Sequence, residues 1–314
     1  MLNCLTDDKK RDSRFELLRI IIMFGIVIGH YMCHGGVLMY GSNINRFVAS
    51  GISIWGGKTS NDIFIMISSW FLIDKRKHNV IDKSIKDLVM RTAFFSFVLC
   101  VISNIVAGTL GIETIFSVFE WIIYGHGYGF IVEYILLVAL YPLLNIAIEN
   151  MSEILLGRMC FWGYVSLMVF RRAYNIPTVF TFILIYFAVA YIKKYKLCLI
   201  RQHWCVIIFF AGSIFVKLCQ SVSQLLGSDN LVYLIDEECD IFVLINALSV
   251  FLFCVKMKPF YNRIVNLMAK DIIVVYLLHE NIYLRSYIWD FLGVIYFIIP
   301  ILCWFIVFYA LVLL

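Results

Sequence analysis

The chain alternates long apolar stretches with short polar ones, and most of the apolar stretches are about long enough to cross a bilayer. A spanning helix needs about 20 predominantly apolar residues. The pattern predicts an all-α polytopic membrane protein with about ten transmembrane helices, near residues 17–38, 58–73, 88–110, 129–148, 159–170, 177–192, 204–225, 239–255, 271–289 and 291–314. A further apolar stretch at 115–124 is interpreted as a re-entrant or interfacial segment.

Composition supports this class of protein and excludes two others. Of 314 residues, 62% are hydrophobic and only 15% are charged, which excludes a soluble globular protein. Long apolar runs exclude a transmembrane barrel, whose strands are short and alternate in polarity. Neither a Gly/Ser-rich or Pro-rich linker nor an internal repeat divides the sequence, so residues 1–314 are predicted to form a single bundle.

Lysine and arginine cluster in four places, and these clusters predict the orientation of the helices. They lie at 9–14, 75–86, 193–201 and 256–270. With ten spans and a cytoplasmic N-terminal tail (residues 1–14), all four clusters fall on the cytoplasmic side, as the positive-inside rule requires. The sequence therefore predicts an N-in and C-in arrangement.

Neither the cysteine spacing nor the net charge indicates a further class of function. The ten cysteines are scattered without a CxxC pair, and most lie inside apolar runs, where cysteine behaves as a small hydrophobic residue. We therefore predict neither a disulfide framework nor a metal site. The formal charge of +5 comes without a basic stripe interleaved with exposed aromatic residues, so a nucleic-acid partner is not expected.

The first apolar stretch carries charged and titratable residues that a membrane helix rarely holds. Arg19 and His30 are eleven residues apart, which places them on one face of a helix, roughly 16 Å apart along its axis. Glu16 precedes Arg19 by three residues and joins the same stripe. Intramembrane ionisable residues are functional by default. The alternative is an interfacial arginine and a histidine satisfied by a neighbouring helix.

Other polar residues in the expected spans fall into two layers. Arg91 lies near an inner helix end, as Arg19 does, whereas Asp62 and Glu133 lie at an outer depth and His279 lies near mid-membrane. Arginine binds phosphate through a planar fork, and a neutral histidine beside a carboxylate accepts a proton near neutral pH. The layers therefore favour a reaction between an anionic cytosolic donor and an acceptor on the outer side.

Each of these residues also has an ordinary structural interpretation. Asp62 could cap the start of its helix, and Glu133 could be a carboxylate at the membrane interface. Arg91 could belong to the positive-inside signal, and His279 could be an interhelical hydrogen-bonding residue. The sequence leaves these alternatives open.

Together these residues resemble the signatures of the acyltransferase 3 family, membrane enzymes that O-acylate bacterial polysaccharides, lipid-linked sugars and some small molecules. The resemblance rests on motifs in the right order: Arg19, ten residues and His30; Asp62-Ile-Phe-Ile-Met-Ile-Ser68-Ser69-Trp70; a basic segment from Lys83 to Arg91; Val132-Glu133 followed by Tyr141-Pro142; and Tyr276-Leu-Leu-His279. Ser69 stands where the family has glycine, and the family's Trp-Ser before the Val-Glu step is missing.

The resemblance implies transfer of an acyl group, commonly acetyl, from cytosolic acyl-CoA to a glycan hydroxyl outside a bacterial plasma membrane. Acyl-CoA would be a co-substrate, with no bound cofactor. The implied roles are His30 as general base or transient acyl carrier, Glu133 or Asp62 as its orienting carboxylate, Arg19 and Arg91 (with Glu16 beside Arg19) on the donor side, and His279 and Asn281 in the acceptor pocket.

Two other classes of function compete with the enzyme. A transporter or flippase for a lipid-linked glycan would use the same polar stripe as a path, but such proteins show repeats or helices broken by Gly and Pro. The four prolines here are expected near span ends. A structural or sensory protein would leave the register of Arg19 and His30 unexplained. The enzyme hypothesis further predicts a cavity that joins Arg19 to His30.

Overall fold

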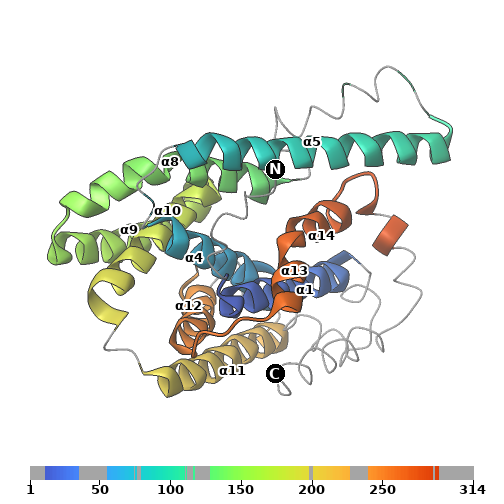
Figure 1. Ribbon diagram of the computed structural model, residues 1–314. Helices are drawn as coiled ribbons and strands as arrows, with labels where there is room; N and C mark the ends of the chain where they lie inside the picture. The colour runs from blue at the N-terminus through green and yellow to red at the C-terminus, as the bar shows by residue number, and fades with distance from the viewer. Residues whose placement is uncertain are drawn as a thin grey trace.

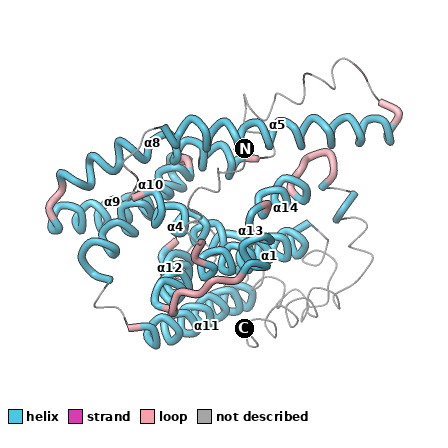
Figure 2. The backbone as a smooth tube through the Cα atoms, in the orientation of Figure 1, coloured by secondary structure: helices cyan, strands magenta, loops and turns pink. Residues whose placement is uncertain are grey.

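The computed structural model describes residues 11–34, 55–73, 75, 79–109, 111, 116, 128–197, 201–226, 240–285 and 287–289. Within these ranges the chain is helical and has no strand, as Figure 2 shows. Among the described residues, six helices are long and apolar enough to cross a membrane: Ser13–Met32, Lys83–Ala107, Gly129–Asn150, Glu153–Arg171, Thr178–Lys196 and Gln202–Val222. An all-α protein with several candidate membrane spans is thus confirmed, whereas ten spans and the N-in, C-in orientation stay predictions.

Helices occur at each of the first eight expected spans (Figure 1). In order, the elements are α1 (Ser13–His34), η1 (Trp55–Thr59), α4 (Ser60–Leu72), α5 (Asn79–Ala107), α8 (Gly129–Asn150), α9 (Glu153–Tyr174), α10 (Thr178–Tyr191), η2 (Ile192–Lys196), α11 (Gln202–Leu226), α12 (Ile241–Lys256), α13 (Arg263–Lys270) and α14 (Ile272–His279). The expected span 291–314 lies outside the described residues, as does 115–124 apart from Phe116.

The expected span 271–289 is not one continuous helix. α14 is only eight residues long and ends at His279, and the chain then turns through residues 281–284. The side-chain oxygen of Asn281 accepts a hydrogen bond from the backbone N–H of Tyr283 (3.0 Å). Asparagine commonly bonds its own backbone two residues on and so favours a turn over a continued helix. Hydrophobicity alone does not reveal this break.

α4 lies at the centre of the bundle and contacts α1, α10 and α12 (Figure 1). Ile65 points to the opposite side of the helix from Ile63 and Ile67, yet all three are completely buried. Burial on two opposite sides requires neighbouring helices on both, and α1, α10 and α12 provide them. The other helices are therefore arranged around α4.

The outer helices expose large apolar side chains. On α5, α9 and α11, exposed residues include Phe94, Ile105, Trp162, Val169 and Phe210. Soluble proteins rarely expose extended apolar patches of this kind. The exposed apolar faces are compatible with contact to a lipid bilayer.

One proline departs from the expectation that all prolines lie near span ends. Pro142 lies inside α8, eight residues before that helix ends at Asn150. Proline removes one helical hydrogen bond, yet α8 continues past it to its end.

Glycines bring α1 and η1 unusually close together. An alanine methyl group at Gly56 would overlap the carbonyl oxygen of Gly25 and would lie 3.0 Å from the backbone nitrogen of Gly29. At Gly57, the next residue, a methyl group would meet nothing within 4 Å. At Gly25 and Gly29 the backbone of α1 therefore contacts the backbone of η1. Small residues are common where membrane helices approach this closely.

This contact predicts opposite outcomes for two neighbouring substitutions. Gly56→Ala should destabilise the folded protein by about 1–3 kcal/mol, because an added methyl group in a filled contact forces backbone shifts. Gly57→Ala should be neutral, or stabilising by up to about 1 kcal/mol, since alanine is the better helix former. Thermal unfolding of both purified variants in detergent measures the difference, and equal unfolding temperatures would contradict it.

Candidate functional site

Two predicted site residues, His30 of α1 and His279 of α14, lie against each other. His30 Nδ1 is 3.0 Å from His279 Nε2, and the ring centroids are 5.1 Å apart. The same His30 nitrogen is 2.8 Å from Glu280 Oε1. The site therefore forms where the C-terminal part of α1 meets the end of α14, far away in the sequence.

The backbone of α14 determines which nitrogen of His279 carries a proton. His279 Nδ1 lies 2.6 Å from the carbonyl oxygen of Val275. A carbonyl oxygen can only accept, so Nδ1 carries the hydrogen and donates it. In the neutral ring, Nε2 then has a lone pair, which faces His30. His279 thus offers an acceptor to the cluster.

Glu280 is the carboxylate of this cluster. Its Oε1 atom faces His30, and its Oε2 atom lies 3.8 Å from Arg285 Nη1. An ionised carboxylate only accepts hydrogen bonds, so a proton on His30 Nδ1 would point toward Glu280 or His279. His30 Nε2 would then hold a lone pair. The His30 side chain is 25% exposed, whereas His279 is 5% exposed, so His30 is the more accessible imidazole.

A small buried network holds the end of α14 in place. The Asn281 side-chain amide donates to the Tyr128 hydroxyl (2.7 Å), which donates to the Leu277 carbonyl (2.9 Å). Asn281 is 1% exposed. Through this hydrogen bond it stabilises the turn that follows His279 and Glu280. The Leu277 carbonyl is one of the last four of its helix and lacks an intrahelical partner. Tyr128 supplies that partner.

Arg19 and Glu16 lie on the same helix as His30 but interact with each other. Arg19 Nη1 is 2.9 Å from Glu16 Oε1, and the guanidinium lies 5.8 Å from the Phe71 ring centroid. Because α1 is unbroken from Ser13 to His34, the eleven-residue spacing does place Arg19 and His30 on one side of it. The cavity expected to join them stays a prediction.

The two carboxylates predicted to orient His30 lie on α8 and α4, and that role stays a prediction for both. Glu133 Oε1 accepts a hydrogen bond from the backbone N–H of Thr178 (3.1 Å), at the start of α10. Asp62 is completely buried and is the third residue of α4, whose N-cap is Thr59, so Asp62 is not that cap. The described contacts of His30 thus point to Glu280, which the sequence analysis did not assign. The sequence signal that could have identified Glu280 is its position directly after His279, within an apolar stretch.

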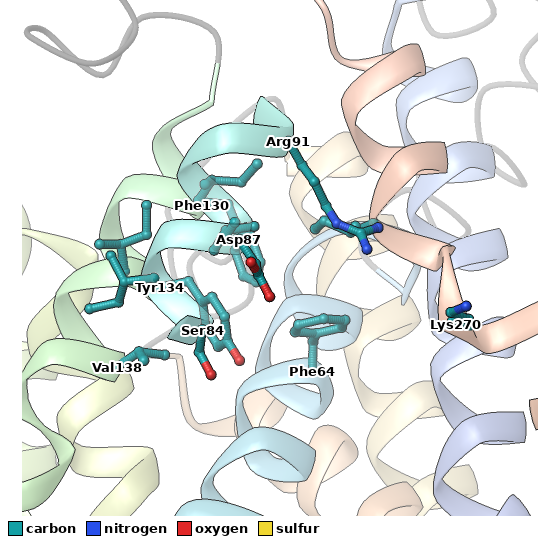
Figure 3. A pocket seen from close by; sticks show the side chains of 13 residues that line it. Phe64, Ser84, Asp87, Arg91, Phe130, Tyr134, Val138 and Lys270 are labelled. Atoms are coloured by element: carbon teal, nitrogen blue, oxygen red, sulfur yellow. The ribbon is translucent and has the colours of Figure 1, made fainter. Parts of the chain in front are cut away.

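Arg91 lines a cavity of about 240 Å³ between α4, α5, α8 and the α13–α14 corner. Figure 3 shows Arg91 and Asp87 extending from α5, with Phe64 of α4 and Lys270 of α13 nearby. Arg91 Nη1 is 3.2 Å from Asp271 Oδ1 at an exposed position. Most of the remaining lining is apolar or aromatic: Ile85, Leu88, Phe130, Ile131, Tyr134, Ile135, Val138 and Ile273. Arg91 and Lys270 together with Asp87 leave this lining with one net positive charge, which suits an anionic amphiphile.

Comparison with known proteins assigns this chain to no group. No family model, no curated protein and no solved structure matches it. The resemblance to acyltransferase 3 stays a prediction from sequence motifs.

The network behind the cluster predicts a specific loss of stability. Tyr128→Phe should destabilise the protein by about 1–3 kcal/mol, because it leaves the Leu277 carbonyl and the Asn281 amide buried with one partner fewer. Tyr287→Phe, at a half-exposed position, should change stability by less than about 0.5 kcal/mol. Thermal unfolding in detergent compares the two variants, and a Tyr128→Phe protein as stable as the parent would refute the role of this hydroxyl.

Proposed function

We propose that this protein is a transmembrane O-acyltransferase that moves an acyl group, most simply acetyl, from cytosolic acyl-CoA to a glycan hydroxyl. The acceptor is an extracytoplasmic or lipid-linked glycan at a bacterial plasma membrane. The observation that carries the proposal is the contact of His30 with His279 and Glu280 inside a bundle of apolar helices. The order of the sequence motifs adds support.

In this proposal His30 is the general base. A proton on Nδ1, directed toward Glu280, leaves the Nε2 lone pair to accept the proton of the acceptor hydroxyl. The hydroxyl oxygen then forms a bond to the thioester carbonyl carbon, the carbon–sulfur bond breaks, and the proton passes from His30 to the departing thiolate. Glu280 keeps the ring oriented and offsets the positive charge that develops on it.

The cavity at Arg91 is the proposed donor site. Arg91 and Lys270 would bind the phosphates of acyl-CoA, and the apolar and aromatic lining would accept its less polar arm. With the N-terminus inside, this end of α5 faces the cytosol, where acyl-CoA is made. Arg19 and Glu16 belong to the same inner layer.

A transporter or flippase for a lipid-linked glycan is the second candidate. Transporter cores often contain helices interrupted by proline; Pro142 lies inside α8, although α8 continues past it. A transporter makes no ester bond, so the two candidates differ in the product that should be lost when His30 is replaced.

Replacing His30 tests the choice between them. His30→Ala should reduce glycan O-acetylation about 10²–10⁴-fold, the usual contribution of a general base. His203→Ala, on α11, is the matched control and should leave it unchanged. The measurement is ester-linked acetate on the glycan of expressing cells, with membrane insertion checked by fractionation. Unchanged acetylation together with lost glycan export would establish the transporter instead.

Replacing Arg91 tests the donor site. Arg91→Gln should raise the KM for acetyl-CoA about tenfold or more, because a hydrogen bond to a charged group contributes about 1.5–3 kcal/mol. The turnover number should change little. Arg158→Gln, an exposed arginine of α9, is the control. Steady-state kinetics of membranes with varied acetyl-CoA measures both, and equal KM values for the two variants would remove Arg91 from the donor site.

A further inference from the structure

Three atoms with electron pairs converge beside the end of α14. They are His30 Nδ1, His279 Nε2 and Glu280 Oε1, and all lie within 4.8 Å of one another. His30 Nδ1 is 3.0 Å from the second and 2.8 Å from the third. His279 and Glu280 are buried, so bulk water does not separate these atoms.

The cluster has more acceptors than protons. The proton of His279 is on Nδ1, used by the Val275 carbonyl, so Nε2 brings a lone pair. Glu280 Oε1 brings another, and it lies 2.8 Å from the same His30 nitrogen. At most one proton, on His30 Nδ1, is shared between the two. Whichever of the two acceptors that proton does not face lacks a donor at this point, which is costly for a buried polar atom, and a cation would satisfy all three atoms at once.

The surroundings also match those of a metal site. Metal-binding histidines usually donate their other ring N–H to a carbonyl or carboxylate, which fixes the ring, and the Val275 carbonyl does this for His279. Arg285 lies beside the other oxygen of Glu280. The cluster also sits at the C-terminal end of α14, where the helix dipole favours positive charge.

We propose that His30, His279 and Glu280 bind a divalent transition metal of the zinc class. Bonds of about 2.0–2.2 Å in a tetrahedral arrangement place ligand atoms about 3.3–3.6 Å apart, so side-chain shifts of about 1 Å complete the site. Two imidazoles and one carboxylate favour zinc over magnesium or calcium, which prefer oxygen ligands. Three protein ligands leave a fourth position for water. The cysteine spacing examined in the sequence gave no sign of this site.

Metal binding and base catalysis exclude each other at His30. A metal on Nδ1 takes that lone pair and leaves the ring proton on Nε2, so the ring can no longer accept a proton there. Bound Zn²⁺ therefore inhibits acyl transfer, and a chelator restores it. The binding site rests on the three side chains alone, whereas the inhibition rests on the proposed function.

The test uses Co²⁺, whose visible absorption is intense when it is tetrahedrally coordinated. The full chain is purified in detergent with an affinity tag free of histidine and titrated with Co²⁺ alone. We expect one Co²⁺ per chain, with tetrahedral bands that disappear when Zn²⁺ is added. His279→Gln and Glu280→Gln should each lose the bands, while His203→Gln and Glu153→Gln, on α11 and α9, should keep them.

Each result decides the proposal. Bands that survive both His279→Gln and Glu280→Gln, or a parent chain that gives none, would overturn the metal site. Thermal unfolding adds a second readout: Zn²⁺ should raise the unfolding temperature of the parent and of His203→Gln but not that of Glu280→Gln. Because no acyl donor is present, a chain that binds Co²⁺ but transfers no acetate would retain the metal site and lose only the proposed enzyme.

Discussion

A polar group buried among apolar helices must find its partner within the protein, and this requirement shapes the described structure. A donor or acceptor that is buried away from water without a partner is costly. His30 meets the requirement through the end of α14, and Tyr128 meets it for the Leu277 carbonyl. Glu133 does the same at the start of α10, where it accepts the Thr178 N–H. Helix ends and polar side chains thus satisfy one another.

The short length of α14 follows from the same requirement and makes the candidate site possible. A helix that ran on would hold the backbone around Glu280 and Asn281 in its own ladder. Because α14 ends at His279, Glu280 lies beside His30, and Asn281 can reach Tyr128. The turn therefore brings an imidazole, a carboxylate and an amide together from consecutive residues. Such a combination arises more easily at a helix end than along one face.

Much of the fold followed from hydrophobicity, because length and apolar content determine which segments form membrane helices. The first eight expected spans each contain a helix, and the spacing of Arg19 and His30 on α1 follows from helical periodicity. The partners of His30 were harder to predict, because contacts between α1 and α14 depend on tertiary packing. His279 was singled out as a polar residue in an apolar stretch. Glu280, its neighbour, received no role because the turn after His279 was not foreseen.

The anchored ring of His279 has a consequence for proton movement. An imidazole that rotates freely can take a proton on one nitrogen and release another from the opposite nitrogen, which makes it a link in a conducting chain. The Val275 carbonyl holds the Nδ1 hydrogen of His279 and gives it no onward acceptor. Any proton that reaches Nε2 must leave by the way it came. The cluster can therefore exchange protons locally without opening a leak across the helix bundle.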